Sequence, residues 1–442
     1  MKMVNRLPGI SLLALTLLSP LANAADTPPP TLNLGSSAWM ITAAVLVLFM
    51  CLPGLALFYG GLVRAKNMLS LFTQCFGIAG VVGVLWVIYG YSMVVDTTNM
   101  IDGQVTFNSF VGGLGRVFLA GMTADSIVGD IPEGVFVTFQ MTFAIITPAL
   151  IAGAFAERMK FSAALIFMAV WFTLVYAPIA HMVWGGAGAL MHNWGTLDYA
   201  GGTAVHINAG VAALAACILL GKRKGYPHTP MPAHNLSFTM VGAAMLWVGW
   251  FGFNIGSGGG LSGISGIVMI NTQLGACAGI IGWMFTEWFK AGRPSALGLA
   301  SGALAGLVGI TPACAYVGTG GALAIGLLCG VICYLGATSL KRRFGYDDSL
   351  DVFGLHGIGG IVGALLTGVF CVPSLGGYVP NVTIAGQLWA QFKGVSFTFV
   401  YCFAVSWIIL KVIKMVIGLR ADEATEELGL DLGEHNESAY NH

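Results

Sequence analysis

The segment GGTAVHINAGVAALAACILLG (residues 201–221) decides the class of fold. It contains no Asp, Glu, Lys or Arg, and at about 1.5 Å per residue a helix of this length crosses the roughly 30 Å hydrocarbon core of a bilayer. The whole chain has the same character, because 57% of its 442 residues are hydrophobic and only 9% are charged. Soluble proteins carry roughly 25% charged residues. The composition therefore excludes a water-soluble fold and predicts an all-α integral membrane protein.

Apolar runs of comparable length recur along the chain, separated by short charged or Pro/Gly-rich segments. Because a transmembrane helix needs about 20 mostly apolar residues, each run is a candidate membrane span. The runs predict eleven transmembrane helices, near residues 38–62, 69–94, 134–155, 161–183, 201–221, 237–255, 263–288, 296–313, 317–340, 352–371 and 387–417. We therefore expect residues 25–418 to form one membrane domain.

The first 24 residues have the pattern of a secretory signal peptide. Lys2 and Arg6 precede an apolar run, Ile10–Leu18, and Ala22-Asn23-Ala24 fits the A-x-A pattern of a cleavage site. We expect residues 1–24 to be removed and the mature N-terminus to be extracytoplasmic.

The distribution of Lys and Arg supports the same topology. With the mature N-terminus outside, every Lys and Arg after residue 24 except Arg116 and Lys393 falls in a cytoplasmic loop or near the C-terminus. Cytoplasmic loops carry an excess of these residues, so the C-terminus is predicted to be cytoplasmic. Residues 419–442 then form an acidic cytoplasmic tail that is available to partners. The outer loop, residues 95–133, is also acidic, and either a merely solvated loop or a weak attraction for cations fits its composition.

Two histidines occupy corresponding positions in the predicted spans. His206 lies in the fifth span and His356 lies in the tenth, within DVFGLHGIGG (351–360). The tetrapeptide Ile-Thr-Pro-Ala also occurs twice, at 146–149 and 310–313. An odd number of helices per repeat turns the second copy upside down, so the sequence predicts inverted five-helix repeats plus an eleventh helix. The two histidines would then face each other near the midplane.

A histidine inside a span must find a polar partner or a cavity, because an unsatisfied buried group costs roughly 2 to 7 kcal/mol. Either histidine alone could be interhelical hydrogen-bond glue. As a pair, His206 and His356 could form a chain of N–H to N bonds and pass a proton while staying neutral overall.

Other candidate residues each allow a structural and a functional interpretation. Asp198 could cap the fifth span or hold negative potential beneath a cation site. Trp184 could be an interfacial belt residue or a cation–π wall. Phe143 and Phe253 could simply pack in the core. Ser257 lies one helical turn after Phe253, so its hydroxyl could accept a hydrogen bond from a bound cation beside that ring.

Several classes of function have no support. A net charge of zero gives no reason to expect a nucleic-acid partner. The nine cysteines show no metal-ligand spacing, and we interpret them as small core residues. The G-x-G-x-x-G match at Gly258, Gly260 and Gly263 lies in a connection without a preceding strand, and neither a P-loop nor a zinc-protease motif occurs. We expect no cofactor, no metal and no enzymatic activity.

Six motifs in order resemble those of the Amt/Mep/Rh family of ammonium transporters, in particular its bacterial Amt type. They are PGLALFYGGLVRAKN (53–67), FAERMKFSAALIF (155–167), APIAHMVWGG (177–186), DYAGGTAVHINAG (198–210), GWFGFNIGS (249–257) and DVFGLHGIGG (351–360). The resemblance covers nearly the whole mature chain and is weakest in the outer loop before Pro132. It implies a homotrimer in the cell inner membrane, with one pore per subunit between the inverted repeats.

The resemblance also assigns roles to individual residues. It implies that Phe143, Trp184 and Ser257 form an outer site that recruits ammonium, with Asp198 supporting the site from behind. It implies that Phe143 and Phe253 stack as a gate beneath that site.

Below the gate, the resemblance implies that His206 and His356 line the pore. Gln140 and Trp250 also stand at family positions, without a separate role. An apolar pore that admits ammonia, with the imidazoles relaying the proton, would reject K⁺, because K⁺ has the same charge as ammonium but cannot lose a proton. The transporter would thus deprotonate ammonium and conduct ammonia and a proton to the cytoplasm.

Three alternatives remain at this stage: a passive channel for ammonia gas, a receptor that senses ammonium, and, more remotely, an enzyme that uses the paired histidines. The tail motif GLDLGEHNESAY (429–440) also looks like the family's cytoplasmic segment, which implies docking of a PII-type signalling protein. The sequence leaves open whether methylammonium is carried.

Overall fold

The computed structural model describes residues 31–440, so the expected signal peptide, residues 1–24, lies outside the described residues. Within them, ten helical segments are long and apolar enough to cross a membrane. Four segments consist of two helices joined by a π-helical turn: α1 (Leu34–Phe49) with α2 (Ala56–Leu62), α3 (Met68–Leu85) with α4 (Tyr91–Val95), α6 (Phe161–Trp171) with α7 (Ala177–Trp184), and α13 (Thr319–Leu335) with α14 (Lys341–Phe344). The other six contain α5 (Glu133–Phe155), α9 (Asn208–Leu220), α10 (Leu236–Gly256), α11 (Ser265–Ala291), α15 (Ile358–Phe370) and α16 (Ile384–Val416).

The eleventh membrane helix is α12 (Ala296–Ile310), which has only 15 residues. We expected this span to reach residue 313, but the helix ends at Ile310 and a turn follows. Pro312 explains the early end, because a proline has no backbone N–H with which to continue the helical hydrogen bonds. Pro148, in the other copy of the same tetrapeptide, instead lies inside α5. The prediction of eleven membrane helices is confirmed, with one of them short.

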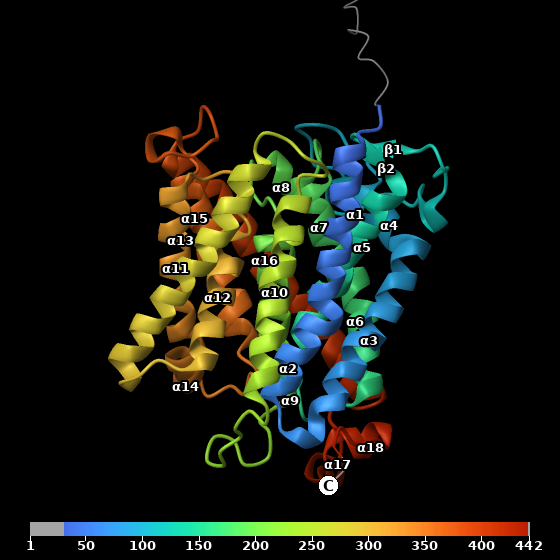
Figure 1. The fold of residues 1–442 in the computed structure, drawn as a ribbon. Helices are drawn as coiled ribbons and strands as arrows, with labels where there is room; N and C mark the ends of the chain where they lie inside the picture. Colours follow the sequence, from blue (N-terminus) through green and yellow to red (C-terminus); the bar gives the residue numbers. More distant parts are fainter. Residues whose placement is uncertain (1–30, 441–442) are drawn as a thin grey trace, which may run out of the picture.

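The two ends of the bundle differ in what covers them (Figure 1). At the hairpin end lie the short antiparallel strands β1 (Ile127–Val128) and β2 (Ile131–Pro132) and the short helix α8 (Leu190–Asn193). At the opposite tail end lie α17 (Glu423–Leu428) and α18 (Leu430–His435).

The fifth and tenth spans run in opposite directions, as inverted repeats require. Each begins with a π-helical turn that contains its histidine, at Gly202–Ile207 and Phe353–Gly357 respectively. The first turn leads into α9, which runs toward the tail end, and the second leads into α15, which runs toward the hairpin end (Figure 1). The two histidine-bearing turns therefore meet in the interior of the bundle.

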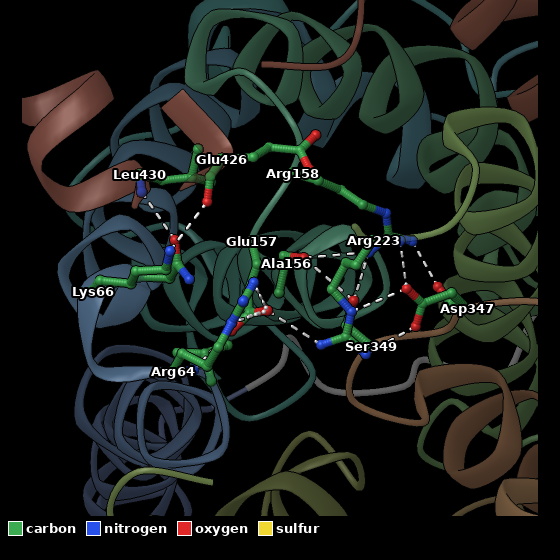
Figure 2. A network of polar contacts seen from close by, with 12 residues as sticks. Arg64, Lys66, Ala156, Glu157, Arg158, Arg223, Asp347, Ser349, Glu426 and Leu430 are labelled. Carbon is green, nitrogen blue, oxygen red and sulfur yellow. Dashed lines mark hydrogen bonds and ion pairs between the residues drawn. The ribbon is translucent and has the colours of Figure 1, made fainter. Parts of the chain in front are cut away.

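A buried ion-pair network holds the tail end together (Figure 2). The Glu157 carboxylate accepts hydrogen bonds from the backbone N–H of Arg64 at 2.7 Å and from its side chain, and it also contacts Arg223 at 3.3 Å. Asp347 accepts two side-chain bonds from Arg223, at 2.8 and 3.0 Å. Burial alone would raise the pKa of Glu157, but the hydrogen bonds and charges of Arg64 and Arg223 lower it overall. Both carboxylates are thus held ionised.

Arg158 links three chain segments at this end: the end of α5, the end of α9 and the segment before the tenth span. Its buried guanidinium donates to the carbonyls of Ala154, Ala156, Gly221 and Asp347 and to the hydroxyl of Ser349. The carbonyls of Ala154, Ala156 and Gly221 lie at or just beyond the ends of α5 and α9, where carbonyl groups lack partners within the helix. The arginine therefore fixes the ends of α5 and α9 against the segment that precedes the tenth span.

The tail folds back onto the tail end. The Asp431 carboxylate accepts from the backbone N–H groups of Leu69 and Ser70, at 3.0 and 2.7 Å, at the start of α3. The acidic residues also pair with basic residues of the same chain: Glu426 binds Arg420, and Glu423 binds Lys224 at 2.5 Å. Part of the negative charge of the tail is therefore neutralised within the chain.

Candidate functional site

Two stacked phenylalanine rings mark the hairpin half of the candidate pore. Phe143 on α5 and Phe253 on α10 lie with ring centroids 4.1 Å apart and planes inclined by 25°. Both side chains are 1% exposed. Trp184, the last residue of α7, meets Phe143 edge-on, with centroids 6.0 Å apart. The three predicted aromatic residues thus form one cluster from three helices.

Ser257 and Trp184 lie beside this stack and are only partly buried. The Ser257 hydroxyl donates to the carbonyl of Phe253 at 2.9 Å, so its lone pairs remain free to accept. The Trp184 indole N–H donates to the backbone carbonyl of Asp198 at 3.0 Å, which orients the ring.

The Asp198 carboxylate caps the start of the fifth span. One oxygen accepts from the N–H groups of Gly201 and Gly202, at 2.9 and 2.6 Å, and the other accepts from Thr203 and Ala204, at 2.8 and 3.0 Å. Burial raises the pKa of Asp198, and these four N–H groups offset part of that rise. The capping role we considered for Asp198 is therefore present. Its carbonyl also accepts the indole N–H of Trp184, so one residue both caps the span and orients that ring.

His206 and His356 are in direct contact below the phenylalanine stack. Their Nδ1 atoms are 3.2 Å apart and their ring planes are inclined by 23°. One of these nitrogens must donate and the other must accept, because two protonated or two bare nitrogens would repel. Within residues 31–440, the buried Nε2 of His206 has no hydrogen-bond partner.

A narrow apolar cavity adjoins the two histidines. The space open to the centre of a water-sized sphere is about 10 Å³, which is room for about one water molecule. Its walls include Leu55, Ile146, Leu150, Val205, Leu246, Leu304, Trp250 and Phe253. Phe58 lines this cavity and also a wider, more polar vestibule of about 320 Å³ that contains Asp351. The vestibule lies at the tail end of the bundle. Because Phe58 lines both spaces, its ring lies between the vestibule and the cavity beside the histidine pair.

Two residues for which the sequence predicted no role, Trp250 and Phe58, also contribute to this site. Trp250 stacks on His206, with ring centroids 5.4 Å apart, and its N–H donates to Thr311 at 2.9 Å. The only feature of the sequence that could have pointed to Trp250 was its place in a family motif. The same holds for Phe58, which lies in the first of the six motifs. Within residues 31–440, no group of three potential ligands is arranged to hold a metal ion.

The comparisons with known proteins agree on one family. The model of the Ammonium Transporter Family matches residues 38–440. The "Ammonium transporter" of Bacillus subtilis (strain 168) is 44% identical over 416 residues, which cover 92% of this chain and 99% of that protein.

Solved structures show the same fold. The crystal structure of Mep2 from Candida albicans superposes with a TM-score of 0.80 at 36% identity, covering 89% of this chain and 88% of that one. A structure described as "Sensor Amt Protein" gives a TM-score of 0.83 at 27% identity, covering 90% and 97%. We conclude that this chain belongs to the Ammonium Transporter Family, a family of membrane transporters and not of enzymes.

Proposed function

We propose that this ammonium transporter recruits ammonium at Phe143, Trp184 and Ser257, removes a proton, and conducts ammonia and the proton separately past His206 and His356. The narrow apolar cavity beside the histidine pair is the observation that carries the proposal. A cation that cannot lose its charge would have to enter that cavity without its water shell.

Recruitment relies on the two groups that flank the phenylalanine stack. An aromatic face attracts a cation by about 0.5 to 2 kcal/mol, depending on how far the cation is desolvated. Trp184 offers such a face, and the acceptor lone pairs of Ser257 suit the N–H groups of ammonium. The bond from Trp184 to the carbonyl of Asp198 supports this role, because it holds the indole in one orientation.

The stacked rings of Phe143 and Phe253 block the way to the histidines, so they must move for each substrate to pass. Below them, the apolar walls disfavour any ion strongly. Ammonium enters only as ammonia, and K⁺ has no neutral form to offer. Selectivity therefore follows from the ability of the substrate to give up a proton.

The proton is assigned to the histidine pair. The contact between the two Nδ1 atoms supports a chain of hydrogen bonds, and the unpartnered Nε2 of His206 can accept a proton from the side of the gate. The ring of His356 would pass that proton toward the vestibule near Asp351.

Electrical recording on reconstituted proteoliposomes tests the proposal. We expect saturable, ammonium-evoked current that depends on membrane potential, with little current from K⁺. Electroneutral ammonia permeation alone would instead establish the gas channel.

A receptor is the second candidate, because one structural relative is described as a sensor. A receptor of this fold would bind ammonium yet carry little flux. The same recordings separate the two functions, since binding without current identifies a receptor.

The cellular setting is part of the proposal. The clustering of Arg64, Arg158, Arg223 and Lys341 at the tail end supports a cytoplasmic location for that face. We propose cleavage of residues 1–24, an extracytoplasmic mature N-terminus, and a homotrimer in the cell inner membrane. Native mass spectrometry measures the oligomeric state, and N-terminal sequencing locates the cleavage.

A PII-type signalling protein is proposed as the partner of the tail end, with residues 419–442 as the cytoplasmic tail. Deletion of the residues after Gly418 should abolish its binding or its control of transport. Because Asp431 also caps α3, Asp431→Asn is the milder companion variant. Intact binding and regulation in the deletion variant would refute this partner site.

A further inference from the structure

His181 lies at the hairpin end in an arrangement that the transport mechanism above does not use. It belongs to α7, one helical turn before Trp184, and its side chain is 0% exposed. Its Nδ1 is 2.7 Å from the carbonyl oxygen of Val94, and its Nε2 is 2.7 Å from the carbonyl oxygen of Asn108. Both ring nitrogens therefore face backbone carbonyls at short hydrogen-bond distance.

The chemistry of the two partners fixes the protonation state. A carbonyl oxygen only accepts hydrogen bonds, so each nitrogen must carry a hydrogen to make its bond. Neutral imidazole has one N–H, and its other nitrogen would direct a lone pair at an oxygen lone pair. Only the imidazolium cation has both N–H groups. We propose that His181 is a buried imidazolium that positions Trp184 by fixing α7 to α4 and to the outer loop.

The two carbonyls come from different segments. Val94 lies near the end of α4, and Asn108 lies in the outer loop, within a short 3₁₀ turn at Phe107–Ser109. Close packing adds to the two bonds, because a methyl group at Gly185 would lie 3.0 Å from the His181 ring. The end of α7 is thus held from two sides directly beside the residue that meets Phe143.

No carboxylate neutralises this cation. Among residues 31–440, His181 makes no ion pair. The nearest acidic group along α4 is Asp96, whose carboxylate accepts from Thr98 and from the N–H of Gly115. On α5, Glu133 binds Tyr91 and Arg116, and Arg116 is the basic group of the same region. The proton on His181 therefore depends on the two carbonyls.

This arrangement predicts that the side chain at position 181 affects recruitment. A side chain that cannot donate to both carbonyls loses one of the two bonds, and either α4 or the outer loop is then released from α7. Trp184 then loses its fixed position, so the apparent affinity for ammonium should weaken while the maximal rate changes little. The link to recruitment rests on the proposed function, whereas the protonation state does not.

Nuclear magnetic resonance on the full-length, unmutated protein tests the protonation state directly. With ¹⁵N-labelled histidine and ¹³C-carbonyl valine and asparagine, we expect one ring with both nitrogens protonated at neutral pH. Its two N–H groups should couple to a valine and to an asparagine carbonyl. A ring with a single N–H at these contacts would overturn the proposal, whatever the transport measurements show.

Transport measurements test the positioning role. His181→Gln should raise the KM for ammonium several-fold and leave kcat within about twofold. His192→Gln is the matched control, because His192 is an exposed histidine at the same end of the bundle. An unchanged KM in a folded His181→Gln protein would show that His181 does not position Trp184. Absence of transport in the unmutated protein would refute the proposed function and leave the magnetic resonance result intact.

Discussion

Gly210 on α9 lies so close to Gly357 that a methyl group on Gly210 would be 2.2 Å from the backbone nitrogen of Gly357. Gly357 directly follows His356, and Gly210 is one helical turn after His206. The two inverted spans therefore cross backbone to backbone, as small residues in membrane helices permit. This crossing brings the two imidazole rings into contact.

Gly210→Ala should disrupt that crossing. The obstacle is backbone rather than a flexible side chain, so α9 and the tenth span must separate, and we expect loss of transport with a lower unfolding temperature. Gly266→Ala on α11 is the control, because nothing lies within 4 Å of the added methyl group. That variant should be neutral or gain up to about 1 kcal/mol from better helix propensity. Equal behaviour of the two variants would contradict the close crossing.

Trp184→Leu combined with Ser257→Ala should weaken recruitment. The pair removes a cation–π contact worth about 0.5 to 2 kcal/mol and a hydrogen bond worth about 1 kcal/mol. The apparent KM for ammonium should rise roughly tenfold or more, since each 1.4 kcal/mol is a factor of ten. Concentration-dependent currents measure this change. An unaltered KM would remove the outer site from the mechanism.

His206→Leu with His356→Leu should abolish ammonium current, because the cavity would keep its apolar walls but lose every group that can carry a proton. Neither a proton nor a hydrated cation would then cross cheaply. Proteoliposome recordings measure the current, and size-exclusion chromatography shows whether the variant is folded. Full ammonium current with K⁺ excluded would mean that the two histidines only hold the helices together by a hydrogen bond and have no role in transport.

Asp347 and Asp348 are neighbours for which the same substitution should have opposite effects on stability. Burial, aided by the charge of Asp351, raises the pKa of Asp348 to about 6, and one of its oxygens has no partner among the described residues. Between about pH 4 and 6 the folded state therefore holds a proton that the unfolded state releases, so stability falls as pH rises through this interval. The loss is complete above about pH 6 and amounts to roughly 3 kcal/mol at most.

Asp348→Asn should therefore remove this pH dependence and leave the protein at least as stable as the unmutated form at pH 7.5. Burial alone would raise the pKa of Asp347, but the hydrogen bonds and charge of Arg223 lower it overall. Asp347→Asn should accordingly be destabilising at the same pH, because the buried guanidinium of Arg223 loses its closest counter-charge and keeps only the 3.3 Å contact with Glu157. Unfolding temperatures of the two variants between pH 4.5 and 7.5 provide the measurement. A less stable Asp348→Asn protein at pH 7.5 would show that Asp348 is ionised and satisfied.

The facing of the two histidines could be anticipated from the repeats, whereas other features of the site could be anticipated only one residue at a time. Asp198 stands just before a helical pattern, so a capping role was foreseeable from local geometry. Its four N–H partners were not, because they depend on a π-helical turn that begins at Gly202. The pairing of Lys224 with Glu423 in the tail was equally hidden, since these residues meet only after the tail folds back.

The sequence by itself determined the class of fold, the number of membrane helices and the chemistry available to them. These properties follow from the free energy of transferring each segment from water into the hydrocarbon core. That free energy depends on the composition and length of the segment alone. The inverted repeats predicted that His206 and His356, 150 residues apart in the chain, would face each other, but only the tertiary structure decided that their Nδ1 atoms lie 3.2 Å apart. Such contacts depend on where helices cross and how closely their backbones approach, and packing between distant segments alone sets that geometry.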